Sequence, residues 1–150
     1  MSDNWIILIP EDPRFVPSPE SQERARQRFL EIAPYADEIE IGVEDKIVFI
    51  DCGGNFQMVR CPSCRAEIPS KWWTARMDDD YEDGFRLDKY ATPCCGKAHT
   101  LHELTYEWPQ GFGRFALNAM NPNLGLLDDK YKREFEEILG TPLRVIYRHI

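Results

Sequence analysis

The sequence lacks the features that mark membrane-spanning, secreted and repetitive proteins. No run approaches the ~20 consecutive apolar residues of a membrane-spanning helix. The apolar run Trp5–Pro10 is too short for the apolar region of a signal peptide, and it follows Asp3 rather than basic residues. There is no internal repeat and no low-complexity tract. These absences predict a cytoplasmic protein, in a compartment that keeps thiols reduced.

Motifs of several enzyme classes are also missing. Neither Gly-x-Ser-x-Gly nor a phosphate-binding glycine-rich loop occurs, and the chain has only three histidines. The stretch Cys52–Asn55, "CGGN", has the composition of a turn rather than of a nucleotide-binding loop. No catalytic residue is therefore assigned from a motif.

Basic residues are scarce relative to acidic ones. Lys and Arg number 18 against 26 Asp and Glu, which gives a formal net charge of −8. This balance argues against sequence-independent binding of nucleic acid and against an anionic membrane surface, because both depend on excess basic side chains. It is compatible with a basic protein partner.

What is present includes the pattern of an α+β body. Ser18 with Pro19 begins a helix that Pro34 ends, and Asp128 or Asp129 caps a second helix that Gly140 ends. Apolar or alternating runs predict the remaining elements, which are strands at Trp5–Ile9, 111–122 and Leu143–Tyr147 and a hairpin over 38–51.

The order of these elements predicts the fold class. Strand, helix, hairpin, strand, helix and strand favour a helix-covered, mostly antiparallel sheet with a ferredoxin-like tendency, although the extra hairpin strand makes that match imperfect. Residues 1–55 and 109–150 would form this α+β body. Residues 56–108 would form an inserted zinc-ribbon subdomain.

Four of the five cysteines predict a metal site. Cys61 and Cys64 form Cys-x-x-Cys, a turn that presents two thiolates to one tetrahedral ion such as zinc. Cys94 and Cys95 follow after residues 65–93, so two hairpin-like turns would converge on one Zn²⁺ of structural role. Cys52, at a predicted strand end, is expected to be a small buried side chain.

The second ligand pair departs from the usual Cys-x-x-Cys, because Thr92 lies three residues before Cys95. We favour a site of four cysteines. A rival uses His99 with one of the adjacent pair, with His102 one step further out. A redox role for Cys61 and Cys64 is disfavoured because Pro69 is expected to block the helix that such pairs normally precede.

Two alternatives concern function. A zinc enzyme would use an open site near His99, His102 and Glu103, although these do not form the His-Glu-x-x-His arrangement. A zinc-ribbon nucleic-acid binder would use a basic cluster that lies near the first turn. Its members are Arg60, Arg65, Lys71 and Arg76.

The stretch "WWTARMDDDYED" is the candidate partner-binding surface, because acidic residues next to an exposed Trp suit an interface. Its candidate residues are Trp72, Trp73, Asp78, Asp79, Asp80, Glu82 and Asp83. With the charge of −8, they predict a non-catalytic module that binds another protein.

The segments "CPSC", "TPCCG", "LTYEWPQGFGRFALNAMNPN" and "PLRVIYRHI" resemble a group of small, mostly uncharacterised bacterial proteins with an inserted zinc ribbon. The resemblance covers roughly the C-terminal two-thirds of the chain. It implies zinc at Cys61, Cys64, Cys94 and Cys95, and it implies no activity. By analogy of fold and charge alone, such proteins are similar to immunity proteins that neutralise a bacterial toxin.

Overall fold

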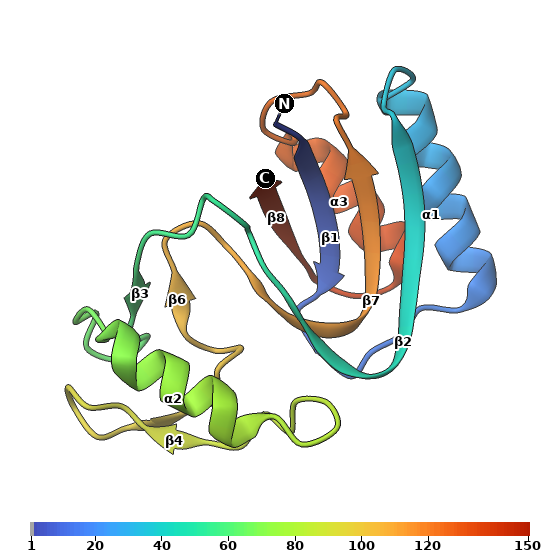
Figure 1. Cartoon of the computed structure of the whole chain (residues 1–150). Coiled ribbons are helices and arrows are strands. Elements are labelled where there is room, and N and C mark those ends of the chain that lie inside the picture. The colour runs from blue at the N-terminus through green and yellow to red at the C-terminus, as the bar shows by residue number, and fades with distance from the viewer. Residues whose placement is uncertain (1) are drawn as a thin grey trace.

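Four strands form the central sheet of the protein (Figure 1). The structure is a computed structural model and describes residues 2–150. The strands lie in the order β2-β7-β1-β8, and each neighbouring pair is antiparallel. Their bounds are β1 Asn4–Pro10, β2 Glu38–Ile50, β7 Gly111–Met120 and β8 Leu143–His149.

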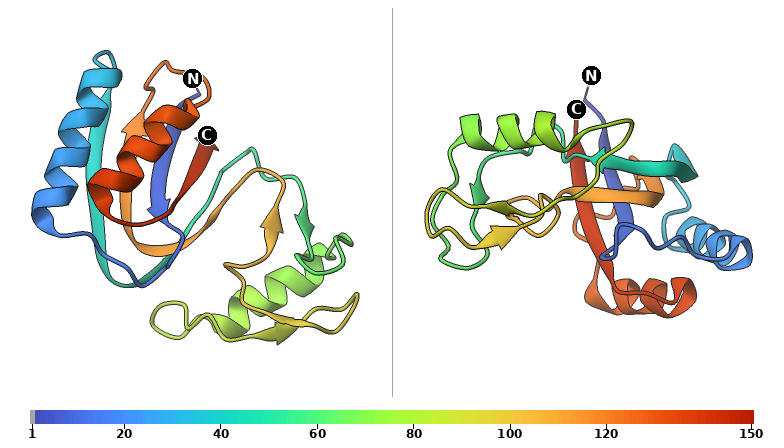
Figure 2. Two further views of the ribbon diagram at one scale, coloured as in Figure 1. Left: turned by 180° about the vertical axis from the view of Figure 1, so that it is seen from behind. Right: turned by 90° about the horizontal axis from the view of Figure 1, so that it is seen from below.

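Two helices cover one face of this sheet, α1 (Pro19–Ile32) and α3 (Asp129–Leu139) (Figure 2). Both begin as predicted, because the side chain of Ser18 accepts from the Ser21 N–H and that of Asp128 accepts from the Lys130 N–H. The rings of Phe29 and Phe135, both fully buried, meet between the helices at a centroid distance of 5.1 Å. The predicted α+β class, with helices on a mostly antiparallel sheet, is confirmed.

The predicted hairpin over residues 38–51 is wrong. These residues form the single strand β2, whose two halves both pair with β7. The pairing shifts between Val43, opposite Phe115, and Val48, opposite Gly113. Residues 44–47, with the turn-like Glu44 and Asp45, therefore form an irregularity that bends one strand instead of reversing the chain.

The chain between β2 and β7 forms a second lobe beside the sheet (Figures 1 and 2). Its small sheets pair β3 with β6 and β4 with β5. The elements are β3 Val59–Arg60, α2 Ser70–Asp80, β4 Tyr90–Ala91, β5 Ala98–His99 and β6 Thr105–Tyr106. A buried cluster that includes Val59, Ile68, Leu101 and Leu104 fills this lobe and continues to Ile47 of β2 and Phe112 of β7.

Helix α2 shows that the prediction of a helix blocked by Pro69 is wrong. Pro69 instead stands immediately before the helix as its N-cap residue, with φ −59°. At the start of a helix a proline loses nothing, since the first N–H groups have no partner within the helix.

A polar junction joins the second lobe to the sheet. The Arg144 guanidinium on β8 forms a two-pronged ion pair with Glu11 and donates to the carbonyls of Gln110 and His102. Gly111 passes so close that a Cβ there would stand 2.7 Å from the Arg144 Nη1 and 2.9 Å from the His102 ring. Only glycine fits without displacing this junction.

None of the helices in residues 2–150 combines the length and the apolar character needed to cross a membrane.

Candidate metal centre

The four predicted cysteines come together at the far end of the second lobe. The sulfur atoms of Cys61, Cys64, Cys94 and Cys95 all lie within 4.8 Å of one another. Within residues 2–150 they form the only group of at least three Cys, His, Asp or Glu side chains with this proximity. The structure thus brings together sulfurs that residues 65–93 separate in sequence.

Two turns with matching backbones present these sulfurs. In the first, the Arg65 N–H donates to the Cys61 carbonyl at 2.9 Å, and the Cys61 N–H donates to the Ala66 carbonyl at 2.9 Å. In the second, Gly96 N–H donates to Thr92 O at 3.0 Å, and Thr92 N–H donates to Lys97 O at 3.0 Å.

The residue after the last cysteine of each turn completes the match. Arg65 has φ 66° and Gly96 has φ 77°, so both adopt the left-handed conformation that turns the chain back. The segments "CPSCRA" and "TPCCGK" are therefore equivalent position by position, which the shared proline and final cysteine of each already indicate in the sequence.

This equivalence shows which position of the second turn is altered. Thr92 stands where Cys61 stands in the first turn, and Cys94 stands where Ser63 stands. The Thr92 side chain is buried, and its Oγ1 lies 3.6 Å from the Cys61 sulfur, 3.5 Å from Cys95 and 3.5 Å from Cys94. Compared with the first turn, the second turn therefore carries its first sulfur two positions later, and a hydroxyl occupies the position that corresponds to Cys61.

The sulfur arrangement fits a four-coordinate ion. At the zinc–sulfur distance of about 2.3 Å, the sulfurs of a regular tetrahedron lie about 3.8 Å apart. The Cys61–Cys95 sulfur distance is 3.7 Å, and that of Cys64 and Cys94 is 3.2 Å. Cys61 is buried and the other three are exposed, so the centre lies at the surface of the lobe.

The turns also stabilise negative charge on sulfur. The backbone N–H of Cys64 lowers the pKa of Cys61 to about 5, and the Lys97 N–H lowers the pKa of Cys95. The Ala66 N–H acts in the same sense on Cys64, but the Cys94 sulfur, burial and the sulfurs of Cys61 and Cys95 together outweigh it, and the pKa of Cys64 rises to about 11. Crowded thiolates with directed N–H groups suit a cation placed between them.

The histidine alternatives are not part of this group of sulfurs. The His99 Nε2 lies 2.7 Å from the Ser63 hydroxyl and forms a hydrogen bond that joins the two turns. His102 is buried in the junction with the sheet, where its Nε2 lies 2.8 Å from the Glu11 carbonyl and its Nδ1 accepts from the Phe112 N–H. Glu103 accepts from the Thr100 N–H within its own turn.

Cys52 lies apart from the other cysteines. It is fully buried, as expected, and its thiol donates to the Gln110 Oε1 at 3.3 Å. Burial raises the pKa of Cys52, which keeps it a neutral thiol.

Asp80 does not lie on the predicted partner-binding surface. It is fully buried, and its carboxylate accepts hydrogen bonds from the Leu87 N–H, the Asp88 N–H and the Tyr90 hydroxyl at 2.7, 2.9 and 2.8 Å. The expectation of a solvated position is wrong here, because the carboxylate closes the loop that follows α2.

The other acids of this stretch remain at the surface. Asp79 pairs with Arg76, Glu82 with Arg86 and Asp83 with Lys46, while Asp78 is exposed. Of the two tryptophans, Trp73 packs against Phe49, Phe56 and Tyr106, and its indole N–H donates to the Tyr106 hydroxyl. Trp72 is half-buried with the Arg76 guanidinium 5.6 Å from its ring centre.

Two of the four basic residues that were candidates for nucleic-acid binding are engaged in contacts within the protein. Arg76 is bound to Asp79, and Arg60 donates to the Arg65 carbonyl. Arg65 and Lys71 are exposed.

Comparison of the chain with models of protein families, with curated proteins and with solved structures found no match.

Proposed function

We propose that the protein is a non-catalytic, zinc-stabilised binding module in which a zinc ribbon is inserted into a ferredoxin-like body. Support for the body comes from the strand order β2-β7-β1-β8, with α1 and α3 as the two crossovers, which is the arrangement of a split β-α-β fold. The whole of residues 51–110 then forms one insertion between the second and third strands of that fold.

The observation that carries the proposal is the approach of four sulfurs to within 4.8 Å on two equivalent turns. Four thiolates are a ligand set that selects zinc or an iron–sulfur centre over hard cations such as Mg²⁺ and Ca²⁺. With four thiolates the coordination is complete, so a bound zinc ion would leave no open position for a substrate. The role of the ion is therefore structural.

The ion would stabilise the second lobe in particular. The regular secondary structure around the turns consists of strands only two residues long. Short strands with a small core need an additional constraint, which a structural metal supplies.

Chelation combined with hydrogen exchange tests this proposal. Protein purified in the presence of a reducing agent is incubated with and without a zinc chelator, and amide exchange is followed along the chain. Amides of residues 59–68 and 90–99 should lose protection, while those of β1 and β7 keep it. Unchanged exchange in both turns after complete removal of the metal would contradict a structural role.

The binding role rests on the net charge of −8 and on the lack of an assigned catalytic set. The proposed partner is a basic protein. In the most specific version of the proposal, this chain is an immunity protein, and the partner is a bacterial toxin that it neutralises in the cytoplasm. Affinity capture from the native host, with Asp78, Asp79, Glu82 and Asp83 substituted together by Asn or Gln as a matched control, tests it. A basic protein should be retained by the natural chain and lost by the control.

Failure to retain any protein at low salt, or equal retention by both chains, would contradict binding through the acidic surface. Such a failure would leave the metal centre unaffected, because none of these four residues contacts the cysteines.

A further inference from the structure

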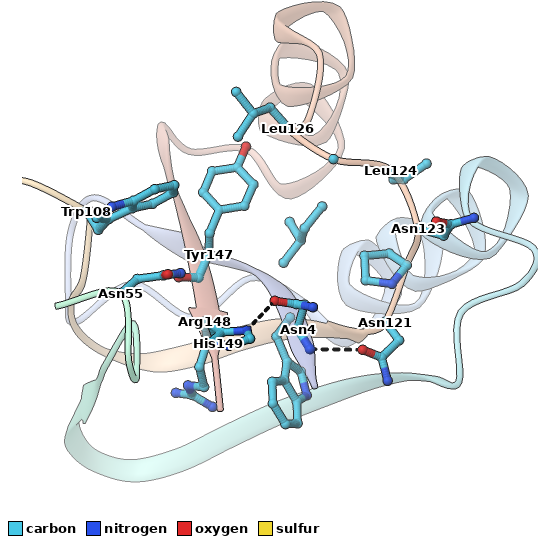
Figure 3. A pocket seen from close by; sticks show the side chains of 14 residues that line it. Asn4, Asn55, Trp108, Asn121, Asn123, Leu124, Leu126, Tyr147, Arg148 and His149 are labelled. Atoms are coloured by element: carbon cyan, nitrogen blue, oxygen red, sulfur yellow. Dashed lines mark hydrogen bonds between the residues drawn. The ribbon is translucent and has the colours of Figure 1, made fainter. Parts of the chain in front are cut away.

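A cavity of about 590 Å³ lies between the ends of β1 and β8, the loop 121–126 and the two linkers to the second lobe (Figure 3). This volume lies within the range of small-molecule sites. The cavity contains no cysteine of the metal centre, so it is a separate feature of the molecule.

Its lining is unusual for so acidic a chain. None of the 14 lining residues is an aspartate or a glutamate, although the protein carries 26 of them. Four are asparagines and three are Trp or Tyr, together with Arg148 and His149. Since the Arg148 guanidinium is paired with Asp51, the lining suits an uncharged ligand, and it offers both ring faces and amide groups to it.

The aromatic side of the cavity comes from Trp108 and Tyr147. Their rings meet edge to face, with centroids 6.2 Å apart and an interplanar angle of 78°. The Tyr147 hydroxyl accepts from the Leu127 N–H, which fixes the ring at the wall of the cavity. In this arrangement a planar ligand can stack on one ring while the other ring supports its edge.

The polar side is held in fixed orientations. The Asn4 Oδ1 lies 2.8 Å from the His149 Nδ1, and the Asn4 backbone N–H donates to the Asn121 Oδ1, as the dashed lines in Figure 3 mark. The Asn55 Nδ2 donates to the Tyr147 carbonyl. Asn4 is exposed and Asn55 is half-buried in the lining of the cavity, so the Asn4 Nδ2 and the Asn55 Oδ1 are placed to pair with a ligand.

The loop that closes the cavity contains three residues in the left-handed backbone conformation. Asn121, Asn123 and Gly125 all have positive φ, at 48°, 57° and 66°. Asn121 is tied down by its side chain, which donates to Asp3 and Asp37. Asparagine and glycine are the residue types that adopt this conformation most readily, so the sequence of the loop suits its shape.

We propose that this cavity binds a planar heteroaromatic ligand with the chemistry of a nucleobase, presented as a free nucleoside. Such a base has the flat face that Trp108 and Tyr147 can stack against. Its edge carries adjacent donors and acceptors, the groups that asparagine amides pair with. The volume of about 590 Å³ suits a ligand of the size of a single nucleoside.

The test uses the full, metal-loaded chain and four probes: adenosine, guanosine, cytidine and uridine. Binding is followed by nitrogen–proton NMR of the tryptophan indoles and of the asparagine side-chain amides. At least one nucleoside should bind saturably with a Kd below about 1 mM, and the largest shifts should fall on Trp108 and Asn4. No saturable binding of any of the four would overturn the proposal.

Two variants locate the site. Asn4→Asp keeps the oxygen that faces His149 but removes the Nδ2 donor, and it should weaken binding at least tenfold with an unchanged fold. Trp108→Leu should abolish binding, while Tyr35→Leu, which removes an exposed ring elsewhere, should have no effect. Equal affinity in the natural chain and in Asn4→Asp would overturn the assignment, even where Trp108→Leu fails to fold.

Discussion

Thr92 occupies in the second cysteine turn the place that Cys61 occupies in the first, and its hydroxyl lies 3.6 Å from the Cys61 sulfur. The backbone around both residues makes the same pair of hydrogen bonds. The centre is thus built from two copies of one turn, of which the second has its first sulfur moved from position 92 to position 94.

This relationship predicts that the sulfur can be returned to its regular place. In the double variant Thr92→Cys/Cys94→Ser both turns read Cys-Pro-Ser-Cys, so four thiolates again face one ion. We expect the double variant to bind one zinc ion per chain, with an affinity within about tenfold of the natural chain. Competition with a chromophoric chelator measures it.

The single variants provide the control for this exchange. Cys94→Ser alone leaves three sulfurs and should lower zinc affinity by at least about a hundredfold, by analogy with the loss of other metal ligands. If the double variant binds no more zinc than Cys94→Ser, the two turns are not equivalent as ligand frames.

His102 predicts a pH dependence of stability. Burial, reinforced by the charge of Arg144, lowers the pKa of His102 to about 4 from an ordinary 6.5, against the opposing influence of Glu11 and Glu103. Protonation in the folded state would also break the hydrogen bond from the Phe112 N–H to the Nδ1. The contribution of neutral His102 to the free energy of unfolding is therefore complete above pH 6.5, and it is lost as the pH falls towards 4.

The size of that loss follows from the shift. A depression of this extent corresponds to about 3 kcal/mol of unfolding free energy between pH 7 and pH 4. Urea unfolding of the natural chain and of His102→Gln, compared at each pH, isolates it, since the carboxylates and the cysteines titrate in both proteins. Identical pH dependence in the two proteins would contradict the account.

Asp80 and Asp78 form a matched pair two residues apart on α2. Asp80→Ala removes an acceptor from two backbone N–H groups and one hydroxyl in a buried site, so we expect a loss of about 3 kcal/mol in unfolding free energy. Asp78→Ala changes only an exposed side chain and should stay within about 0.5 kcal/mol. Chemical denaturation of both variants measures the difference, and equal effects would refute the structural role of Asp80.

Much of the fold could be predicted because the signals were local. Ser18 and Asp128 cap the helices that their sequences indicate, and Gly140 ends α3 with φ 74°. The cluster of cysteines could be predicted for the same reason, since Cys-x-x-Cys places two sulfurs on one turn whatever surrounds it.

The errors arose where tertiary contacts decide between local alternatives. Glu44 and Asp45 favour a turn, yet pairing with β7 on both sides holds β2 as one strand. Asp80 reads as one more acid in "DDDYED", and only the return of the chain over residues 87–90 gives its carboxylate three donors. The role of Thr92 had a signal in the sequence, the matched prolines and cysteines of "CPSC" and "TPCC", which comparison of the two turns would have found.

The central claim is that one zinc ion ties the two turns together, and the metal content of the purified chain tests it most directly. The mass of protein prepared under reducing conditions without added metal is measured by native mass spectrometry, before and after acid denaturation. We predict the loss of one zinc ion per chain on denaturation, with Cys61, Cys64, Cys94 and Cys95 protected from alkylation until then. A folded chain that carries no metal, or one whose cysteines are joined in disulfides, would contradict the account.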